Sequence, residues 1–420
     1  MRKHLRSILF SAALLFFTCS PIVLFATNYI DKNAIPTILS NEKAVYLEGA
    51  GPTTRIKDVA NLDGFLSKDL QTIIEEKVGS FIPFKADAIL CNAALQRSAI
   101  AASNMLFNWS CYPTFFSSLY VSMPSADIVI PMGRSHTEAM EKGAQSFVDA
   151  INKARENNPD VRFVYQTIDD TYSSAINPSQ PLTSNALSEE WIEEVALSRL
   201  DPEIEVVKES IDGIDEISTQ WYSSEHHWTI DRAIQAYNEV AALLGLTIYD
   251  NLPLHEVSPK WQGGSARNGL CMDYPSTLWD TDIDFSSLEV SVDGGPFSDL
   301  SARGNRGPTT KEGYSGKDSL YAFYNYYHWY YGTPKSEVIY KNTSSNNGKT
   351  LLFVQQSYGV PLEPYFAMNY DTTICIDPAN RSAKMTLDEY IEKYDVDDVV
   401  IQMGSIAYTN IAKNSSNLFE

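Results

Sequence analysis

The last third of the chain contains the stretch Leu-Leu-Phe-Val-Gln-Gln-Ser-Tyr-Gly, at residues 351–359. Its first four residues form a short apolar run, which is typical of a strand buried on both faces of a parallel sheet. Active groups in such sheets gather at the carboxyl ends of the strands. Ser357 is therefore a candidate nucleophile, and the backbone N–H groups beside it are candidates for an oxyanion hole.

Strand and helix patterns alternate from residue 126 onward, which predicts an α/β fold with a mainly parallel sheet covered on both faces. Apolar runs separated by amphipathic stretches carry this prediction. The expected strands are 127–130, 161–165, 351–354, 373–376 and 399–402, and the expected helices are 138–156, 188–199, 231–244 and 386–392.

Three parts of the chain are expected to differ in organisation. Residues 31–120 form an N-terminal lead-in that packs on the main domain, and residues 121–420 form the main α/β domain. Within it, residues 246–318 contain repeated glycines with Pro and Asp between them, which indicates a loop-rich insertion with short antiparallel strands.

The first thirty residues have the form of a secretory signal or a membrane anchor. Arg2, Lys3 and Arg6 precede an apolar run from Ile8 to Ala26, whose length is close to that of a bilayer-spanning helix. We expect the rest of the chain to be exported and to lie outside the cytoplasm, where disulfides form. Cys91 with Cys111 is the most plausible pair, and Cys375 is expected to be a buried thiol.

The charge of the chain excludes one class of partner. It has 53 acidic and 32 basic residues, for a net charge of −21. Such a surface repels phosphate backbones and anionic lipids, so nucleic acid is not an expected partner, and membrane contact is expected only through an N-terminal anchor.

Residues 224–231 read Ser-Glu-His-His-Trp-Thr-Ile-Asp, just before the helix expected at 231–244. In an extended segment residues i and i+2 project from the same side, so Glu225 would contact His227 while His226 points away. A carboxylate on Nδ1 fixes the imidazole tautomer and leaves Nε2 free to accept a proton from a hydroxyl group. The motif therefore predicts a general base.

Two other interpretations of this motif exist. Glu225 and the two histidines could cap the helix on a polar surface, with Thr229 as N-cap. They could also bind a metal, but adjacent side chains diverge in a strand, so we expect neither a metal site nor a cofactor.

The order and content of several blocks resemble the signature of the DHHW proteins, named for Asp-His-His-Trp. The resemblance covers about half of the chain, in patches between residues 140 and 404. Its main blocks are Trp-Tyr-Ser-Ser-Glu-His-His-Trp-Thr at 221–229, Gly-Lys-Thr-Leu-Leu-Phe-Val at 348–354 leading to Ser357-Tyr358, and Ile376-Asp377-Pro378 with Arg381.

DHHW proteins are similar to the alginate O-acetylation proteins. The resemblance implies an SGNH-hydrolase-like three-layer sandwich with circularly permuted motif order, and a triad of Ser357, His227 and Glu225. Two positions depart from the pattern: Glu225 stands where Asp is usual, and Gln356 replaces the Asp that usually precedes the serine.

The resemblance implies an exported serine O-acyltransferase or esterase that moves acetyl groups to or from a cell-envelope or secreted polysaccharide. Its partners would be a glycan and an acyl donor, which a membrane acyltransferase could supply. The alternative is a degenerate carbohydrate-binding or scaffold protein. Substrate contacts are expected from Tyr358, Trp228, His226 and Arg381, although Arg381 could instead pair with Asp377.

The segment Tyr321–Tyr331 is aromatic almost throughout. A core or sheet-face role is expected for it, with a carbohydrate-stacking platform as the alternative.

Overall fold

The computed structural model describes residues 2–30, 60–79, 82–107, 111–115, 119–132, 138–168, 189–209, 211, 213–258, 260–306, 325–404, 407–408, 410–411 and 418. Part of the expected lead-in, residues 31–59, and the start of the aromatic segment, residues 321–324, lie outside these ranges.

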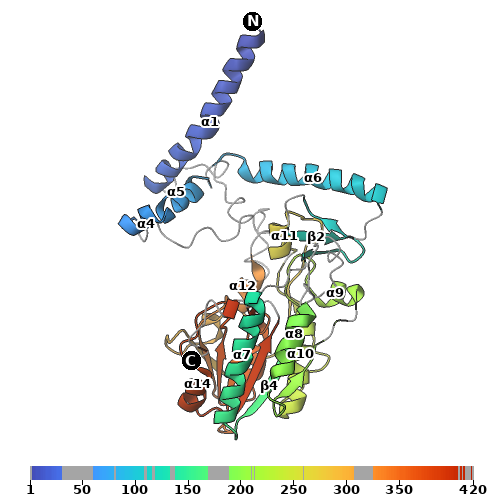
Figure 1. Ribbon diagram of the computed structural model, residues 1–420, viewed down its shortest axis with the longest axis vertical. Coiled ribbons are helices and arrows are strands. Elements are labelled where there is room, and N and C mark those ends of the chain that lie inside the picture. Colours follow the sequence, from blue (N-terminus) through green and yellow to red (C-terminus); the bar gives the residue numbers. More distant parts are fainter. Residues whose placement is uncertain are drawn as a thin grey trace.

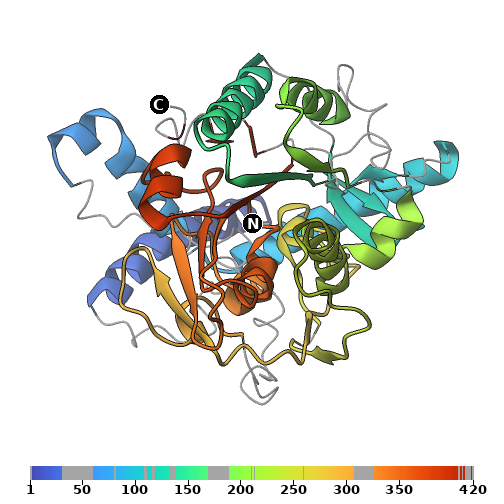
Figure 2. The ribbon, with the colours of Figure 1, turned by 90° about the horizontal axis from the view of Figure 1, so that it is seen from below.

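A seven-stranded sheet, seen in Figure 2, forms the centre of the α/β part of the chain. Five strands run parallel, and the last two in the order pair antiparallel at one edge. The predicted α/β class with a mainly parallel sheet is confirmed. The strand order is β5 (Glu205–Val207), β4 (Arg162–Thr167), β12 (Asp398–Met403), β10 (Thr350–Val354), β11 (Thr372–Ile376), β9 (Val338–Asn342) and β8 (Leu288–Val292).

Alternating residues of the central strand β10 enter two separate cores, one on each face of the sheet. Leu351 and Phe353 pack with α10 (Ile230–Leu244), α12 (Tyr326–Tyr331) and α13 (Glu363–Ala367). Leu352 and Val354 pack with α7 (Glu138–Asn157), α8 (Glu189–Arg199) and α14 (Leu387–Tyr394). Both faces of the sheet are therefore covered by helices, which explains the continuous apolar sequence of β10.

Local sequence signals set the ends of two predicted helices. Thr229 begins α10, and Gly245 ends it with φ at 69°, a left-handed conformation that suits glycine. Thr386 begins α14 with the predicted capping box, in which its hydroxyl accepts from the backbone N–H of Glu389 and the Glu389 side chain accepts from the N–H of Thr386.

The strand predicted at 127–130 forms but joins a different sheet. It is β3 (Ile128–Pro131), which pairs antiparallel with β2 (Tyr120–Met123), itself paired with β1 (Tyr112–Pro113). The reason is local, because the tight turn at Ala126 bonds back to Met123 and closes a hairpin before any long-range pairing is needed. The prediction that this strand belongs to the parallel sheet was wrong.

The described part of the segment 246–318 combines loops with short antiparallel strands, as the sequence predicts. It contributes the edge strand β8 to the main sheet, and a separate two-stranded antiparallel sheet of β6 (Leu254–Glu256) and β7 (Trp279–Thr281). The remaining helices of the described chain are α1 (Arg2–Ile30), α4 (Leu62–Leu66), α5 (Asp69–Gly79), α6 (Lys85–Phe107), α9 (Ile214–Gln220) and α11 (Gly264–Asn268), with 3-10 turns at Leu300–Ala302 and Val360–Leu362. Figure 1 shows α1 and α4 to α6 at one end, apart from the main sheet. Among the residues described, no helix is long and apolar enough to cross a membrane.

The predicted Cys91–Cys111 disulfide does not form, and all five cysteines are free. Cys91 lies in α6, and the helix rises about 24 Å from there to its end at Phe107. The four residues from there to Cys111 span at most about 14 Å, so the two thiols cannot meet. Cys375 is a buried thiol of β11, as predicted.

Candidate active site

The motif 224–228 forms a tight turn rather than an extended strand. Trp221 and Trp228 form an antiparallel bridge, and the N–H of Tyr222 donates to the carbonyl of His227 at 3.1 Å. Within the turn, the N–H of Glu225 donates back to the carbonyl of Tyr222 at 3.3 Å. Glu225 and His227 therefore meet across a turn, and the same-side argument from an extended chain gave the right pair for the wrong reason.

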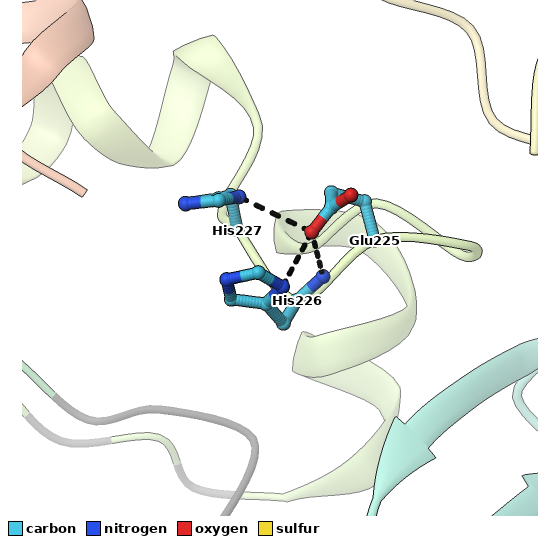
Figure 3. A group of neighbouring side chains, drawn as sticks. All are labelled: Glu225, His226 and His227. Carbon is cyan, nitrogen blue, oxygen red and sulfur yellow. Dashed lines mark hydrogen bonds and ion pairs between the residues drawn. The ribbon is translucent and has the colours of Figure 1, made fainter. Parts of the chain in front are cut away.

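Glu225 is the hub of this turn (Figure 3). Its Oε1 lies 3.3 Å from His227 Nδ1, accepts the backbone N–H of His226 at 2.9 Å, and also contacts His226 Nδ1. Its Oε2 accepts the N–H of Gly264 at 2.5 Å. Both oxygens of this buried carboxylate are thus held in place, which fixes the direction from which it meets His227.

The expectation that His226 points away from Glu225 was wrong. Its ring lies 4.0 Å from the ring of His227, and both Nδ1 atoms face the same carboxylate oxygen. In Figure 3 the two imidazoles converge on Glu225 from one side. One ligand atom from each of Glu225, His226 and His227 falls within 4.8 Å of the others, so the geometric argument against a metal site also fails.

A glycine pair holds the back of the turn. A Cβ on Gly263 would lie 2.5 Å from the carbonyl oxygen of Ser224, and one on Gly264 would lie 3.0 Å from Glu225 Oε2. The Ser224 hydroxyl accepts the N–H of Gly263 at 2.9 Å and pairs with Ser276 at 2.8 Å. The close approach of the Ser224 backbone to Gly263, and of the Glu225 carboxylate to Gly264, explains why both positions are glycine.

Ser357 follows β10 and lies against the turn. Its Oγ is 2.9 Å from His227 Nε2. Two neighbours tie the segments together: the indole N–H of Trp228 donates to the carbonyl of Tyr358 at 3.0 Å, and the Tyr358 hydroxyl donates to the carbonyl of His226. Trp228 and Tyr358 are both buried, so their observed contacts position the loops around the site.

Tyr327 completes the surroundings of His227. Its ring stacks on the imidazole at 3.9 Å with an interplanar angle of 11°, and its hydroxyl donates to the carbonyl of Ser357 at 3.1 Å. The described part of the aromatic segment is the short helix α12, with four of its tyrosines buried. The core role is confirmed there, although the segment is helical and does not lie on a sheet face.

Burial and neighbouring charges shift the pKa values of the site. Burial of the ring, and then the charge of His226, lower the pKa of His227 to about 3, although Glu225 acts in the opposite direction. Burial raises the pKa of Glu225, but the charge and hydrogen bonds of His226 and His227 outweigh this and hold the pKa well below its usual value. The pair therefore consists of an ionised carboxylate and a neutral imidazole at neutral pH.

A cavity of about 230 Å³ opens on Glu225, His226 and His227. Arg267 and His328 also line it, and burial lowers the pKa of each of these two side chains. The wall therefore combines one guanidinium and one carboxylate with imidazole rings, of which His227 and His328 are in the neutral form at neutral pH.

Two further predicted residues lie elsewhere. The Arg381 guanidinium donates to the carbonyl of Pro334 at 3.1 Å and of Asn380 at 3.3 Å, and Arg381 does not line the cavity. The Asp377 carboxylate instead accepts from Asn380. Gln356 is buried. Its side-chain amide packs against Gly404, just after β12, so closely that a Cβ on this glycine would lie 3.0 Å from the amide nitrogen.

Sequence reasoning missed Tyr327, Gly263 and Gly264 as parts of the site. The glycine pair was visible in the sequence, but only as a sign of loops. Nothing local connects residue 264 with residue 225, because their contact depends on tertiary folding.

Comparisons with known proteins rest on structure alone, since no protein-family profile and no curated protein sequence matches the chain. The crystal structure of a DHHW family protein from Eubacterium siraeum aligns with a TM-score of 0.53 and 13% identity, over 70% of this chain and 95% of that protein. The chain shares the fold of a DHHW family protein. The resemblance inferred from the motifs is thereby confirmed at the level of fold.

Three further solved structures align with the chain. Bacillus cereus PatB1 aligns with a TM-score of 0.52 and 13% identity, over 72% of this chain and 97% of that protein, and a second PatB1 structure carries a sulfonyl adduct. The O-acetyltransferase domain of Pseudomonas putida AlgJ aligns over 70% of this chain and 91% of that domain, with 9% identity and a TM-score of only 0.32.

Proposed function

We propose that this chain is an exported serine O-acyltransferase or esterase that moves acetyl groups to or from a polysaccharide, with Ser357, His227 and Glu225 as its catalytic triad. The observation that carries the proposal is the 2.9 Å contact between Ser357 Oγ and His227 Nε2, with Glu225 facing the other ring nitrogen. Nucleophile, base and orienting acid are thus in the order that acyl transfer needs.

The chemistry follows from the protonation states. Neutral His227 accepts the Ser357 proton at Nε2 while Oγ bonds to the acyl carbon, and the resulting imidazolium is stabilised by Glu225. When the tetrahedral intermediate collapses, the imidazolium gives its proton to the departing donor oxygen, and an acyl-serine forms. A sugar hydroxyl or water then attacks the acyl carbon while His227 takes its proton; when the bond between the acyl carbon and Oγ breaks, the imidazolium returns that proton to Oγ and Ser357 is regenerated.

Hydrogen bonding favours the triad over a metal site. The carboxylate of Glu225 already accepts two backbone N–H groups, and His227 Nε2 is engaged by Ser357. A metal on Nδ1 of His227 would put the ring proton on Nε2 and prevent it from accepting the serine proton. The extra methylene of Glu225, compared with Asp, is accommodated by the turn.

The finer assignments belong to the same proposal. The three-layer arrangement supports an SGNH-hydrolase-like fold, and the order of Glu225 and His227 before Ser357 supports circular permutation of its motifs. The basic first residues support export by an N-terminal signal or anchor. The acyl donor would come from a separate protein, and a membrane acyltransferase is the class that fits an exported chain.

A sulfonyl fluoride tests the nucleophile, because it sulfonylates activated hydroxyl groups. Wild-type protein should acquire one sulfonyl group, and peptide mapping should place it on Ser357. The Ser357→Ala variant should acquire none, while Ser301→Ala, at an exposed serine of a 3-10 turn, should react like the wild type. If the Ser357→Ala variant were still sulfonylated to the same extent, Ser357 would not be the nucleophile.

A further inference from the structure

A second cavity, of about 430 Å³, lies beside the arms of the motif turn. The tip of the turn, Glu225 to His227, lines the site cavity, whereas residues 221–223 and 229–231 line the second one. In the part of the chain that the structure describes, the two cavities share no lining residue. A ligand in the second cavity would therefore bind without entering the site around Ser357.

An exposed tryptophan forms part of the second cavity. Trp279 of β7 keeps 41% of its surface exposed, although most of the tryptophans of the described core are buried. Its backbone is fixed, since the carbonyl of Trp279 accepts from the Tyr331 hydroxyl at 3.1 Å. An exposed indole on a fixed backbone offers a flat apolar face for stacking.

Hydroxyl and indole groups make up much of the remaining wall. Ser218, Thr219, Ser223 and Thr277 contribute hydroxyl-bearing side chains. The indole N–H of Trp221 and the hydroxyl of Thr229 are buried without a hydrogen-bond partner among the described residues. Thr229 begins α10 yet gives the helix no side-chain cap, so its hydroxyl is not used by the fold.

Charge limits the class of ligand. Among the described residues that line the cavity, Asp231 is the one ionisable carboxylate and none is basic. Together with the net charge of −21, this disfavours anionic ligands. A flat ring with many hydroxyl groups and no charge fits the combination of indole, hydroxyl and carboxylate, and the volume falls in the usual range of ligand sites.

We propose that this cavity is an accessory binding site for an uncharged pyranose chain, which stacks on Trp279 and hydrogen-bonds to the hydroxyl-rich wall. The site holds glycan outside the reactive centre, so it does not depend on the triad. If Ser357 proved not to be a nucleophile, the proposal of a glycan-binding site in this cavity would still stand.

Calorimetric titration and saturation-transfer NMR on the full chain carrying Ser357→Ala test the site, with the hexamers of β-1,4-linked glucose and of N-acetylglucosamine as probes. This background separates binding from turnover. At least one hexamer should bind at millimolar concentration or below, and Trp279→Ala should weaken its binding about tenfold through loss of the stacking face. An oligogalacturonate of equal length should bind more weakly because of its charge.

Two further variants locate the site. Thr229→Val removes the hydroxyl while keeping the shape, and should weaken binding without lowering the melting temperature, because that hydroxyl caps nothing. Phe297→Ala is the matched control, since Phe297 is 39% exposed and lies outside this cavity, and it should leave affinity unchanged. Absence of binding by both neutral hexamers, or Trp279→Ala binding as tightly as its parent, would overturn the proposal.

Discussion

Tyr327 lies flat against His227, with ring centroids 3.9 Å apart, and its hydroxyl donates to the carbonyl of Ser357. One side chain therefore contacts both the base and the backbone of the nucleophile. Tyr327 is a positioning residue in this arrangement, since it holds the two groups at their mutual distance without itself exchanging protons.

Removing the hydroxyl of Tyr327 should separate positioning from stability. Tyr327→Phe keeps the stacked ring but loses a hydrogen bond, which costs about 1 kcal/mol of stability. We expect slower sulfonylation of Ser357 as well. The control is Tyr370→Phe, which loses the buried bond to Asp398 at the opposite end of the sheet. It should lower the unfolding free energy by a similar amount while leaving the sulfonylation rate unchanged; equal rates in both variants would contradict the positioning role.

His226 should set the protonation of its neighbour. Its charge is the second largest cause of the low pKa of His227, after burial. In His226→Gln the pKa of His227 should rise, so the neutral base would be lost at a higher pH than in the wild type. Acetyl-ester hydrolysis measured against pH, together with NMR titration of the imidazole protons, reports this shift.

The wild type should accordingly show no loss of hydrolysis near pH 6.5 from His227, since a base with a pKa of about 3 is neutral well below that pH. His255→Gln, which removes a surface imidazole paired with Asp282, is the control and should not move the profile. An unchanged or lower pKa in His226→Gln would disprove the coupling.

The glycine behind the turn should tolerate no side chain. In Gly263→Ala the new Cβ would lie 2.5 Å from the carbonyl oxygen of Ser224, which is backbone and cannot rotate away. We expect a loss of about 1–3 kcal/mol of stability and a slower reaction at Ser357, because the turn that holds Glu225 must shift. Chemical denaturation measures the first effect and sulfonylation the second.

Gly213→Ala provides the comparison for that variant. A Cβ there meets nothing within 4 Å, and φ is 168°, an extended conformation open to any residue. This variant should be as stable and as reactive as the wild type. If Gly263→Ala were also as stable and as reactive as the wild type, the tight packing behind Glu225 would have no role in the site.

Several elements could be predicted because their signals are local. The strand β10 is apolar from Leu351 to Val354, and α14 carries its capping box within four residues. The pair of Glu225 and His227 was also within reach of the sequence. The convergence of His226 was not, because it depends on a turn closed by the contact between Trp221 and Trp228.

Long-range contacts account for the other failures. The sheet chosen by β3 depends on a hairpin partner, β2, which the sequence pattern did not reveal. The short strands β5 and β9 were not predicted, since three to five residues carry little periodicity and their pairing decides their structure. Gly264 reaches Glu225 only in the folded chain.

Asp377 should make stability fall as pH rises. Burial raises its pKa to about 7, although hydrogen bonds from Asn380 oppose this. The usual pKa in an unfolded chain is about 3.9, so stability from the protonated form is complete below that value and is lost as the pH rises to 7. Asp377→Asn keeps an oxygen for Asn380 and removes the charge, so it should melt higher than the wild type at pH 8.

The melting difference between Asp377→Asn and the wild type should shrink from pH 8 to pH 4.5. Asp371→Asn should instead melt lower than the wild type by a similar amount at both pH values, because hydrogen bonds from Ser345 and from backbone N–H groups lower the pKa of that carboxyl group, and stability gained in this way is lost only below a pH of about 3.9. Melting curves at a series of pH values measure both differences. A difference for Asp377→Asn that does not change with pH would show that its carboxyl group does not titrate in this range.

The covalent intermediate tests the central claim most directly. Protein mixed with an activated acetyl ester, quenched in acid within the first turnover and measured by intact-protein mass spectrometry, should gain the mass of one acetyl group, and peptide mapping should place that group on Ser357. His227→Ala should accumulate it far more slowly, and Ser357→Ala should not gain it at all. An acetyl group on any other residue, or full turnover by Ser357→Ala, would contradict the assignment of Ser357, His227 and Glu225 as a catalytic triad.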